Sequence, residues 1–207
     1  MRKILTSEEA EEVLKPFYPQ LIETVEKGIM DYNSCLSISN SSLSIKQVYE
    51  PATKSMIIWN YIINHAKNTF SNNEYIKPMI YKRVFGLLIH NSLFLRFKKV
   101  NKNGNSYNIA TNNSDTFNEQ GSLNNFPGNP TLLKVGWQMN PTYTSAKDIF
   151  VICPISSTKI RWKIDLYEKI GKQISLLQPE NDDRSSEIEK LLTISKNLKL
   201  KTNYGNT

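Results

Sequence analysis

Residues 51–70 form the segment that most constrains how this 207-residue chain can fold. Pro51 suits the first turn of a helix, because its fixed φ matches the helix and its missing N–H needs no partner there. Apolar side chains then cover much of the circumference; they are Met56, Ile57, Ile58, Trp59, Tyr61, Ile62, Ile63, Ala66 and Phe70. A helix that is apolar nearly all round belongs inside a domain. We therefore expect residues 51–70 to form a buried central helix.

The residues after this helix change to the alternating periodicity of strands. Two β-rich runs, 80–89 and 93–100, are separated by a turn-like triplet at 90–92, which predicts a hairpin. Further strand-like runs lie at 132–139, 148–153 and 158–166. The sequence thus predicts an α+β fold, with an antiparallel sheet of about five strands packed on the central helix.

Helical segments are expected before and after the sheet. Thr6 and Glu9 have the spacing of a capping box, and apolar residues recur at helical spacing up to residue 33. The Ser/Asn-rich stretch 33–44 is predicted to be a loop. The expected C-terminal helices span 167–178 and 185–198. These predictions divide one compact domain into an N-terminal helical segment (1–45), an α+β core (46–166) and a C-terminal helical segment (167–207).

Composition is typical of a globular, intracellular protein. Hydrophobic residues make up 39% and charged residues 22%, which separates the chain from the disordered class. No apolar run approaches the roughly 18 residues of a membrane span, and the N-terminus turns acidic before an apolar region develops. Cys35 and Cys153 are far apart and lack metal-ligand spacing. Two free thiols are the simpler interpretation, with a single disulfide as the alternative, and we expect a cytoplasmic location.

The positive charge of the chain is concentrated in one stretch without acidic residues. Between residues 75 and 114 there are seven basic residues and no Asp or Glu: Lys77, Lys82, Arg83, Arg96, Lys98, Lys99 and Lys102. The net charge is +7, and the remaining 19 of the 26 basic residues balance the 19 acidic ones. Outside this stretch the protein is therefore neutral.

The predicted hairpin carries most of this charge, so it is the leading candidate for a binding surface. In its second strand Leu93, Leu95 and Phe97 share one face, while Phe94, Arg96, Lys98 and Val100 share the other. We predict that nucleic acid or an acidic cognate protein binds six cations: Lys82, Arg83, Arg96, Lys98, Lys99 and Lys102. Phe94 and Tyr107 are candidates for stacking on bases. The plain alternative is a solvated sheet face kept basic to discourage edge pairing.

Enzymatic interpretations have less support in the sequence. A metal-dependent nuclease needs carboxylates near the scissile phosphate, but the nearest acids lie outside the hairpin: Glu50, Glu74, Asp115 and Asp165. A metal-independent RNase needs an acid/base pair, and nothing selects one from His65, Tyr81, His90 and Lys98. His65 suits a satisfied core or boundary position. No phosphate loop, dinucleotide fingerprint or zinc spacing occurs, so the sequence predicts neither a cofactor nor a metal.

Seven short segments between about residues 50 and 165 resemble a family of uncharacterised bacterial proteins found in mobile or prophage-like loci. They are SMIIWNYIINHA (55–66), GLLI (86–89), LRFKK (95–99), NIAT (108–111), FNEQ (117–120), VGWQ (135–138) and ICP (152–154). The resemblance implies a partner of a repressor-type protein with a zinc-peptidase-like domain, as in toxin–antitoxin pairs. Its members tend to have an acidic residue where this chain has Asn60, which favours a binding role here.

The function predicted from sequence is therefore that of an accessory protein in a bacterial defence, toxin–antitoxin or mobile-element system. It would bind nucleic acid or a cognate protein through the basic hairpin, and it could form homo-oligomers. One alternative is a toxin-type nuclease acting on RNA or DNA, and another is a non-catalytic scaffolding partner.

Overall fold

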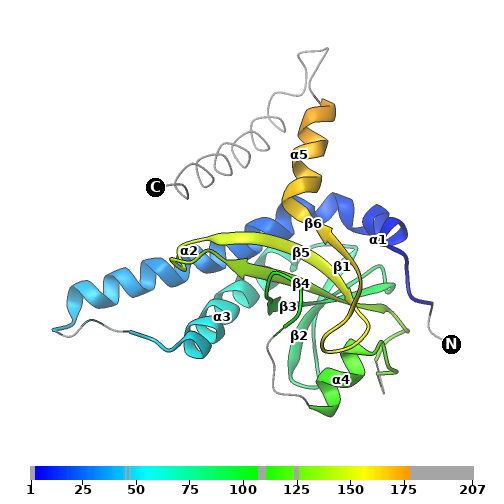
Figure 1. Cartoon of the computed structure of the whole chain (residues 1–207). Coiled ribbons are helices and arrows are strands. Elements are labelled where there is room, and N and C mark those ends of the chain that lie inside the picture. Colours follow the sequence, from blue (N-terminus) through cyan, green and yellow to red (C-terminus); the bar gives the residue numbers. More distant parts are fainter. Residues whose placement is uncertain (1–2, 45, 47, 107–110, 124–125, 178–207) are drawn as a thin grey trace. The chain divides into compact units, whose positions relative to one another are not determined.

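The structure is a computed structural model that describes residues 3–44, 46, 48–106, 111–123 and 126–177 (Figure 1). The chain divides into two compact units, Met1–Asp165 and Leu166–Thr207. In the first unit the helical elements are α1 (Ser7–Leu14), a 3-10 helix η1 (Lys15–Phe17), α2 (Tyr18–Ser42), α3 (Pro51–Phe70) and α4 (Asn112–Asn118). Its strands are β1 (Ile76–Tyr81), β2 (Val84–Ile89), β3 (Leu93–Lys99), β4 (Thr131–Met139), β5 (Ala146–Pro154) and β6 (Ile160–Asp165).

The described part of the second unit is a single helix, α5 (Leu166–Leu177), where the sequence predicts one. The helix predicted at 185–198 lies outside the described residues. None of the described helices combines the length and the apolar character that crossing a membrane requires.

The strands form one six-stranded mixed sheet in sequential order, so the predicted α+β class is confirmed. The prediction of about five antiparallel strands is wrong in two respects. The run 80–89 does not form one strand, because the chain reverses at Lys82 and Arg83 and pairs β1 with β2. In addition, β3 and β4 run parallel. A parallel pair requires a crossover of a dozen or more residues, and residues 100–130 provide it.

The helix predicted at 51–70 is confirmed as α3, which contacts β1 and β3, but only one of its faces is buried and Met56 is 61% exposed. Trp59 on α3 donates a hydrogen bond from Nε1 to the backbone oxygen of Phe97 at 3.1 Å, which ties α3 to the sheet. Helix α2 packs closely on α3 at Gly28, where an added Cβ would lie 2.5 Å from Cγ1 of Ile62. The capping box of Thr6 and Glu9 also forms as expected.

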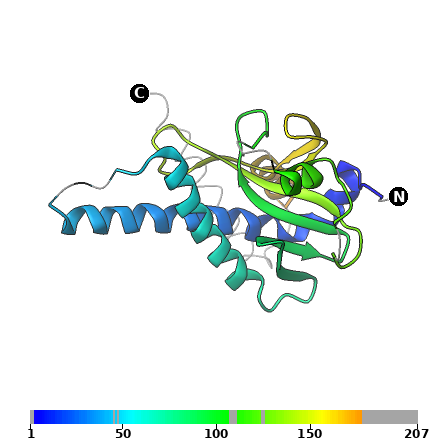
Figure 2. The same ribbon diagram turned by 90° about the horizontal axis from the view of Figure 1, so that it is seen from below.

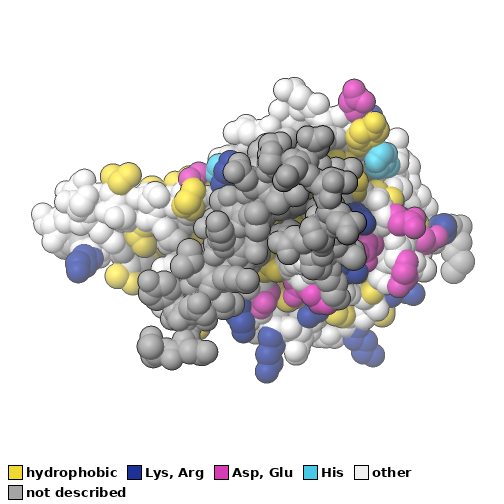
Figure 3. Space-filling model, turned by 90° about the horizontal axis from the view of Figure 1, so that it is seen from above, with side chains coloured by type: hydrophobic (Ala, Val, Ile, Leu, Met, Phe, Trp, Pro, Cys, Tyr) yellow, Lys and Arg dark blue, Asp and Glu magenta, His cyan; other side chains and the backbone are white. Residues whose placement is uncertain are grey.

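The loop predicted at 33–44 is instead the second half of α2, which projects beyond the sheet (Figures 1 and 2). Ser41 and Ser42 donate hydrogen bonds to the backbone oxygen of Ile38. Their hydroxyls thus find a partner within the helix itself. Once the packed first half has nucleated the helix, each further residue adds to it at low cost. Figure 3 shows few charged side chains on this projecting arm, in line with a sequence that carries no charge from residue 33 to 45.

The two faces of the sheet differ in what covers them. Leu93, Leu95 and Phe97 are buried on the face that carries α3, as their spacing predicts. On the opposite face, Phe94 packs with Phe117 of α4, and their ring centroids lie 6.4 Å apart. Helix α4 therefore covers only part of the second face, and the cations of β3 lie next to it.

Candidate functional site

Three cationic residues lie side by side on the α4 face of the sheet. Arg96 and Lys98 are two apart in β3, so they point to the same side. In the parallel register Arg96 is the direct partner of Lys134 in β4. Neighbouring strands are about 4.8 Å apart, which places the three side chains in one group. We call Arg96, Lys98 and Lys134 the cation cluster.

Arg96 is held against an aromatic ring, and no carboxylate of the described residues neutralises its charge. The guanidinium carbon lies 4.6 Å from the ring centroid of Phe117, in cation–π geometry. Its Nε is wholly buried and meets no hydrogen-bond acceptor in the described part of the chain. Nor does any described carboxylate form a salt bridge with Arg96. Burial lowers the pKa of Arg96 to about 10, so the group remains charged at neutral pH.

Lys134 is the most deeply buried member, with only 4% of its surface exposed. Its Nζ donates one hydrogen bond, to Oγ of Ser106 at 3.2 Å, and no described carboxylate pairs with it. Burial, and then the charges of Lys98 and Arg96, lower the pKa of Lys134 to about 8. Burial and the charge of Arg96 likewise lower the pKa of Lys98 to about 8. Buried charges are normally paired, so Arg96 and Lys134, which form no salt bridge with a described carboxylate, are costly to keep buried.

The crossover after β3 builds one wall of this site. Thr111 caps α4 by accepting a hydrogen bond from the backbone of Ser114. After α4, the buried Gln120 accepts from the backbone N–H of Leu132 at 2.9 Å and donates to the oxygen of the same residue at 2.7 Å. Gln120 thus pairs with β4 as a strand residue would. This attachment fixes α4, and with it Phe117, over Arg96.

The turn between β1 and β2 builds the opposite wall at a cost in backbone strain. Lys82 and Arg83 have φ values of 45° and 66°. A two-residue hairpin turn of this kind favours Asn and Gly, because other residues cost about 1–2 kcal/mol each in the left-handed region. Two basic residues occupy it here. The turn places Lys82 beside the site, with its Nζ 5.6 Å from the ring centroid of Tyr81.

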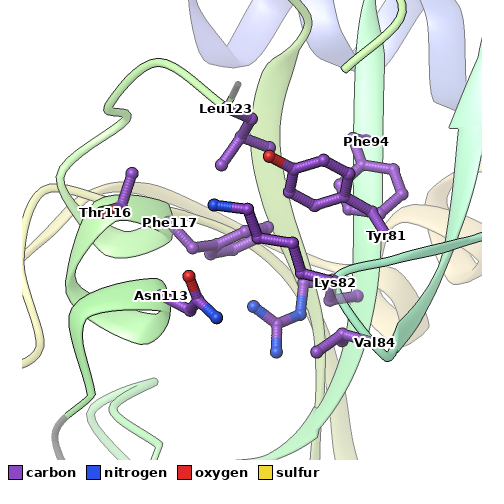
Figure 4. Close-up of a pocket in the computed structure, with 9 residues that line it drawn as sticks. Tyr81, Lys82, Val84, Phe94, Asn113, Thr116, Phe117 and Leu123 are labelled. Carbon is purple, nitrogen blue, oxygen red and sulfur yellow. The ribbon is translucent and has the colours of Figure 1, made fainter. Parts of the chain in front are cut away.

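A shallow pocket opens between this turn and α4, next to the cation cluster (Figure 4). Its volume is about 340 Å³, including the solvent at its mouth. Residues from β1, the turn, β2, β3, α4 and the segment after α4 line it: Tyr81, Lys82, Val84, Phe94, Arg96, Asn113, Thr116, Phe117 and Leu123. Figure 4 shows the amino group of Lys82 and the amide of Asn113 on either side of the Phe117 ring. Two cations and no acid line the pocket.

The six cations nominated by the sequence are divided among different surfaces. The structure brings together Lys82, Arg96 and Lys98. Lys99 points to the opposite face, where its Nζ donates to Oγ of Ser55 at 3.1 Å and to the hydroxyl of Tyr143 at 2.9 Å.

Arg83 and Lys102 are exposed, and neither lines the pocket. Of the stacking candidates, Phe94 is buried and lines the pocket, while Tyr107 lies outside the described residues.

Lys134 was not nominated from the sequence, because it lies 20 residues beyond the acid-free stretch. The signal that Lys134 gives in the sequence is a cation in a mostly apolar strand. Its place beside Arg96 depends on the parallel register of β3 and β4, which no local pattern reveals.

The acids and histidines nominated for catalysis do not assemble into a site. Within the described ranges, no group of three His, Cys, Asp or Glu residues is placed to hold a metal ion. Asp165 lies on the same sheet face, but the register puts Phe150 between it and β4. The Nε2 of His65 lies 2.7 Å from Oδ2 of Asp31, so this histidine has a partner on α2. His90 sits in the turn after β2, with its ring near that of Tyr75.

Comparisons with protein-family models, curated proteins and solved structures gave no match. The resemblance to the mobile-element family therefore stays a prediction from the sequence, and any proposed function depends on the site itself.

Proposed function

We propose that this protein binds single-stranded nucleic acid, with phosphate groups held at the cation cluster. The observation that carries this proposal is Arg96, a half-buried guanidinium without a carboxylate partner that opens onto a pocket. Arginine presents five donors in a planar fork that matches phosphate oxygens. An anion from outside the chain would supply the missing partner.

The recessed position of the cluster favours a flexible ligand over a rigid one. Lys134 is almost fully buried, so it acts through its field and not by direct contact. The smooth backbone of a duplex cannot enter a pocket of this size, whereas a single strand can turn a phosphate or base inward. The aromatic rings at the pocket also suit a base, which an acidic peptide does not offer.

An accessory role in a defence or toxin–antitoxin system is compatible with such binding. The nucleic acid could belong to an invading element or to the operator and transcript of a cognate pair. This assignment depends on the family resemblance and on the identity of the neighbouring genes.

The test is a fluorescence anisotropy titration with a labelled single strand of about 15 nucleotides at about 50 mM salt. We expect Arg96→Met to weaken binding about tenfold or more. Lys99→Met is the matched control, because it removes one cation from the same strand on the opposite face, and its affinity should stay close to that of the wild type. Equal losses of affinity in the two variants would contradict the assignment of the binding site to the α4 face of the sheet.

Two competitors then identify the class of partner. An unlabelled duplex should compete poorly against the labelled single strand. Polyglutamate that competes as well as the single strand would show an acidic protein surface to be the natural partner and would contradict the proposal.

A further inference from the structure

We propose that the pocket between α4 and the β1–β2 turn binds a nucleoside monophosphate, with the phosphate on Arg96 and Lys82 and the base beside Tyr81. This inference deepens the proposed function and rests on it for the location of the nucleic acid. The ligand is either a free nucleotide or the phosphorylated end of a strand, since both present the same phosphomonoester.

The charge of the pocket fits a phosphomonoester better than a phosphodiester. Lys82 and Arg96 both line the pocket, no acid does, and neither cation forms a salt bridge with a described carboxylate. A phosphomonoester carries a charge of about −1.5 to −2 at neutral pH and offers three acceptor oxygens, so it can satisfy both cations. A phosphodiester inside a strand carries one charge and has two free oxygens.

The polar groups of α4 complete the site. Asn113 is exposed on α4, and its side-chain amide makes no hydrogen bond within the described part of the chain. In Figure 4 this amide is turned toward the pocket. It can donate to a phosphate oxygen or read the edge of a base.

The shape of the pocket suits a ligand that places one end inside it. The pocket is shallow and open to solvent, so its walls would hold the phosphate while the rest of the ligand lies at its mouth. Helix α4 and the strained turn bound it on opposite sides. A nucleotide or the end of a strand can place its phosphate between these walls.

The strained turn supports a functional role for Lys82. Asn or Gly at positions 82 and 83 would relieve the left-handed backbone, yet the chain keeps Lys and Arg there. Unfavourable backbone geometry at a ligand site is a recognised sign of a constraint from binding.

Isothermal titration calorimetry of the full chain with uridine monophosphate, uridine and inorganic phosphate tests the inference. We expect the monophosphate to bind and uridine to bind at least about tenfold more weakly, because uridine cannot form the charged hydrogen bonds. Inorganic phosphate that binds as tightly as the nucleotide would overturn the role of the base.

Lys82→Asn and Arg83→Asn form a matched pair, since each removes one cation from the same turn and places a turn-compatible residue there. Lys82→Asn should weaken nucleotide binding about tenfold, whereas Arg83→Asn should leave it unchanged. The same loss in both variants, or in neither, would contradict the proposed site.

Two oligonucleotides separate the sources of the ligand and the two proposals. A strand with a 5′-phosphate that binds more tightly than its 5′-hydroxyl counterpart identifies the strand end as the ligand, while equal affinities with nucleotide binding intact identify the free nucleotide. Nucleotide binding without any strand binding would refute the proposed function but support the pocket as a nucleotide site. Strand binding without nucleotide binding would refute the pocket alone.

Discussion

Lys134→Met should make the unliganded protein more stable while weakening its affinity for the ligand. Methionine keeps the length of the side chain and removes a charge that no described carboxylate neutralises. The pKa of Lys134 falls from 10.5 to about 8, and a pKa difference of one is worth about 1.4 kcal/mol, so the buried charge costs about 3 kcal/mol. Losing the hydrogen bond to Ser106 offsets about 1 kcal/mol.

The net gain of about 2 kcal/mol corresponds to a rise in Tm of roughly 4–8 °C for a chain of this size. Urea denaturation and calorimetry near pH 7 without nucleic acid would measure both quantities. A variant less stable than the wild type by more than about 1 kcal/mol would refute the reasoning, because it would show that the ammonium is well satisfied in the native state.

The pH dependence of the stability difference between Lys134→Met and the wild type tests the same reasoning. Below about pH 8 the lysine is protonated in both the native and the unfolded state, so the full penalty applies. Between about pH 8 and 10.5 the unfolded state binds more protons, and the stability of the wild type rises relative to the variant. The advantage of Lys134→Met should therefore shrink across this window. An advantage that stays constant throughout it would contradict the assignment to Lys134.

Three further predictions concern the framework of the fold. Gly28→Ala should destabilise the protein by about 1–3 kcal/mol in urea, because the new methyl would clash with Ile62; no change in midpoint would show that α2 and α3 can separate freely. Gln120→Ala should lower the free energy of unfolding by about 1–3 kcal/mol, since it leaves buried backbone groups unpaired, and unaltered stability would mean that water replaces the amide. A thiol reagent should modify the exposed Cys35 quickly and the buried Cys153, whose pKa is raised to about 11, only after unfolding; two rapid thiols would contradict the burial of Cys153.

Periodicity predicted some of the local elements of the fold but not all of them. The apolar residues of 51–70 predict the helix α3 but overstate its burial, since only one face is covered. Alternation predicts the position and the buried face of β3. The loop predicted at 33–44 failed for a physical reason: serine and asparagine have low helix propensity, but propagation from a packed half-helix outweighs it. The strand predicted at 80–89 failed because its turn carries Lys82 and Arg83 and lacks the residues that normally mark one.

The cation cluster could be predicted only in part, because it depends on the packing of distant segments. Charge counting selected Arg96 and Lys98 but grouped them with Lys99, whose side chain lies on the other face. It also led to the expectation of a surface, whereas the cluster is recessed. Lys134 joins the cluster through strand pairing after a long crossover, so only the tertiary structure reveals it.

The salt dependence of binding tests most directly the claim that Arg96 holds a phosphate. For a single strand, the slope of log affinity against log salt becomes shallower by about 0.7 for each phosphate that the protein no longer binds. We predict a slope shallower by about that amount for Arg96→Met than for the wild type, with the Lys99→Met slope unchanged. Identical slopes for the wild type and Arg96→Met would show that Arg96 binds no phosphate and would contradict the claim.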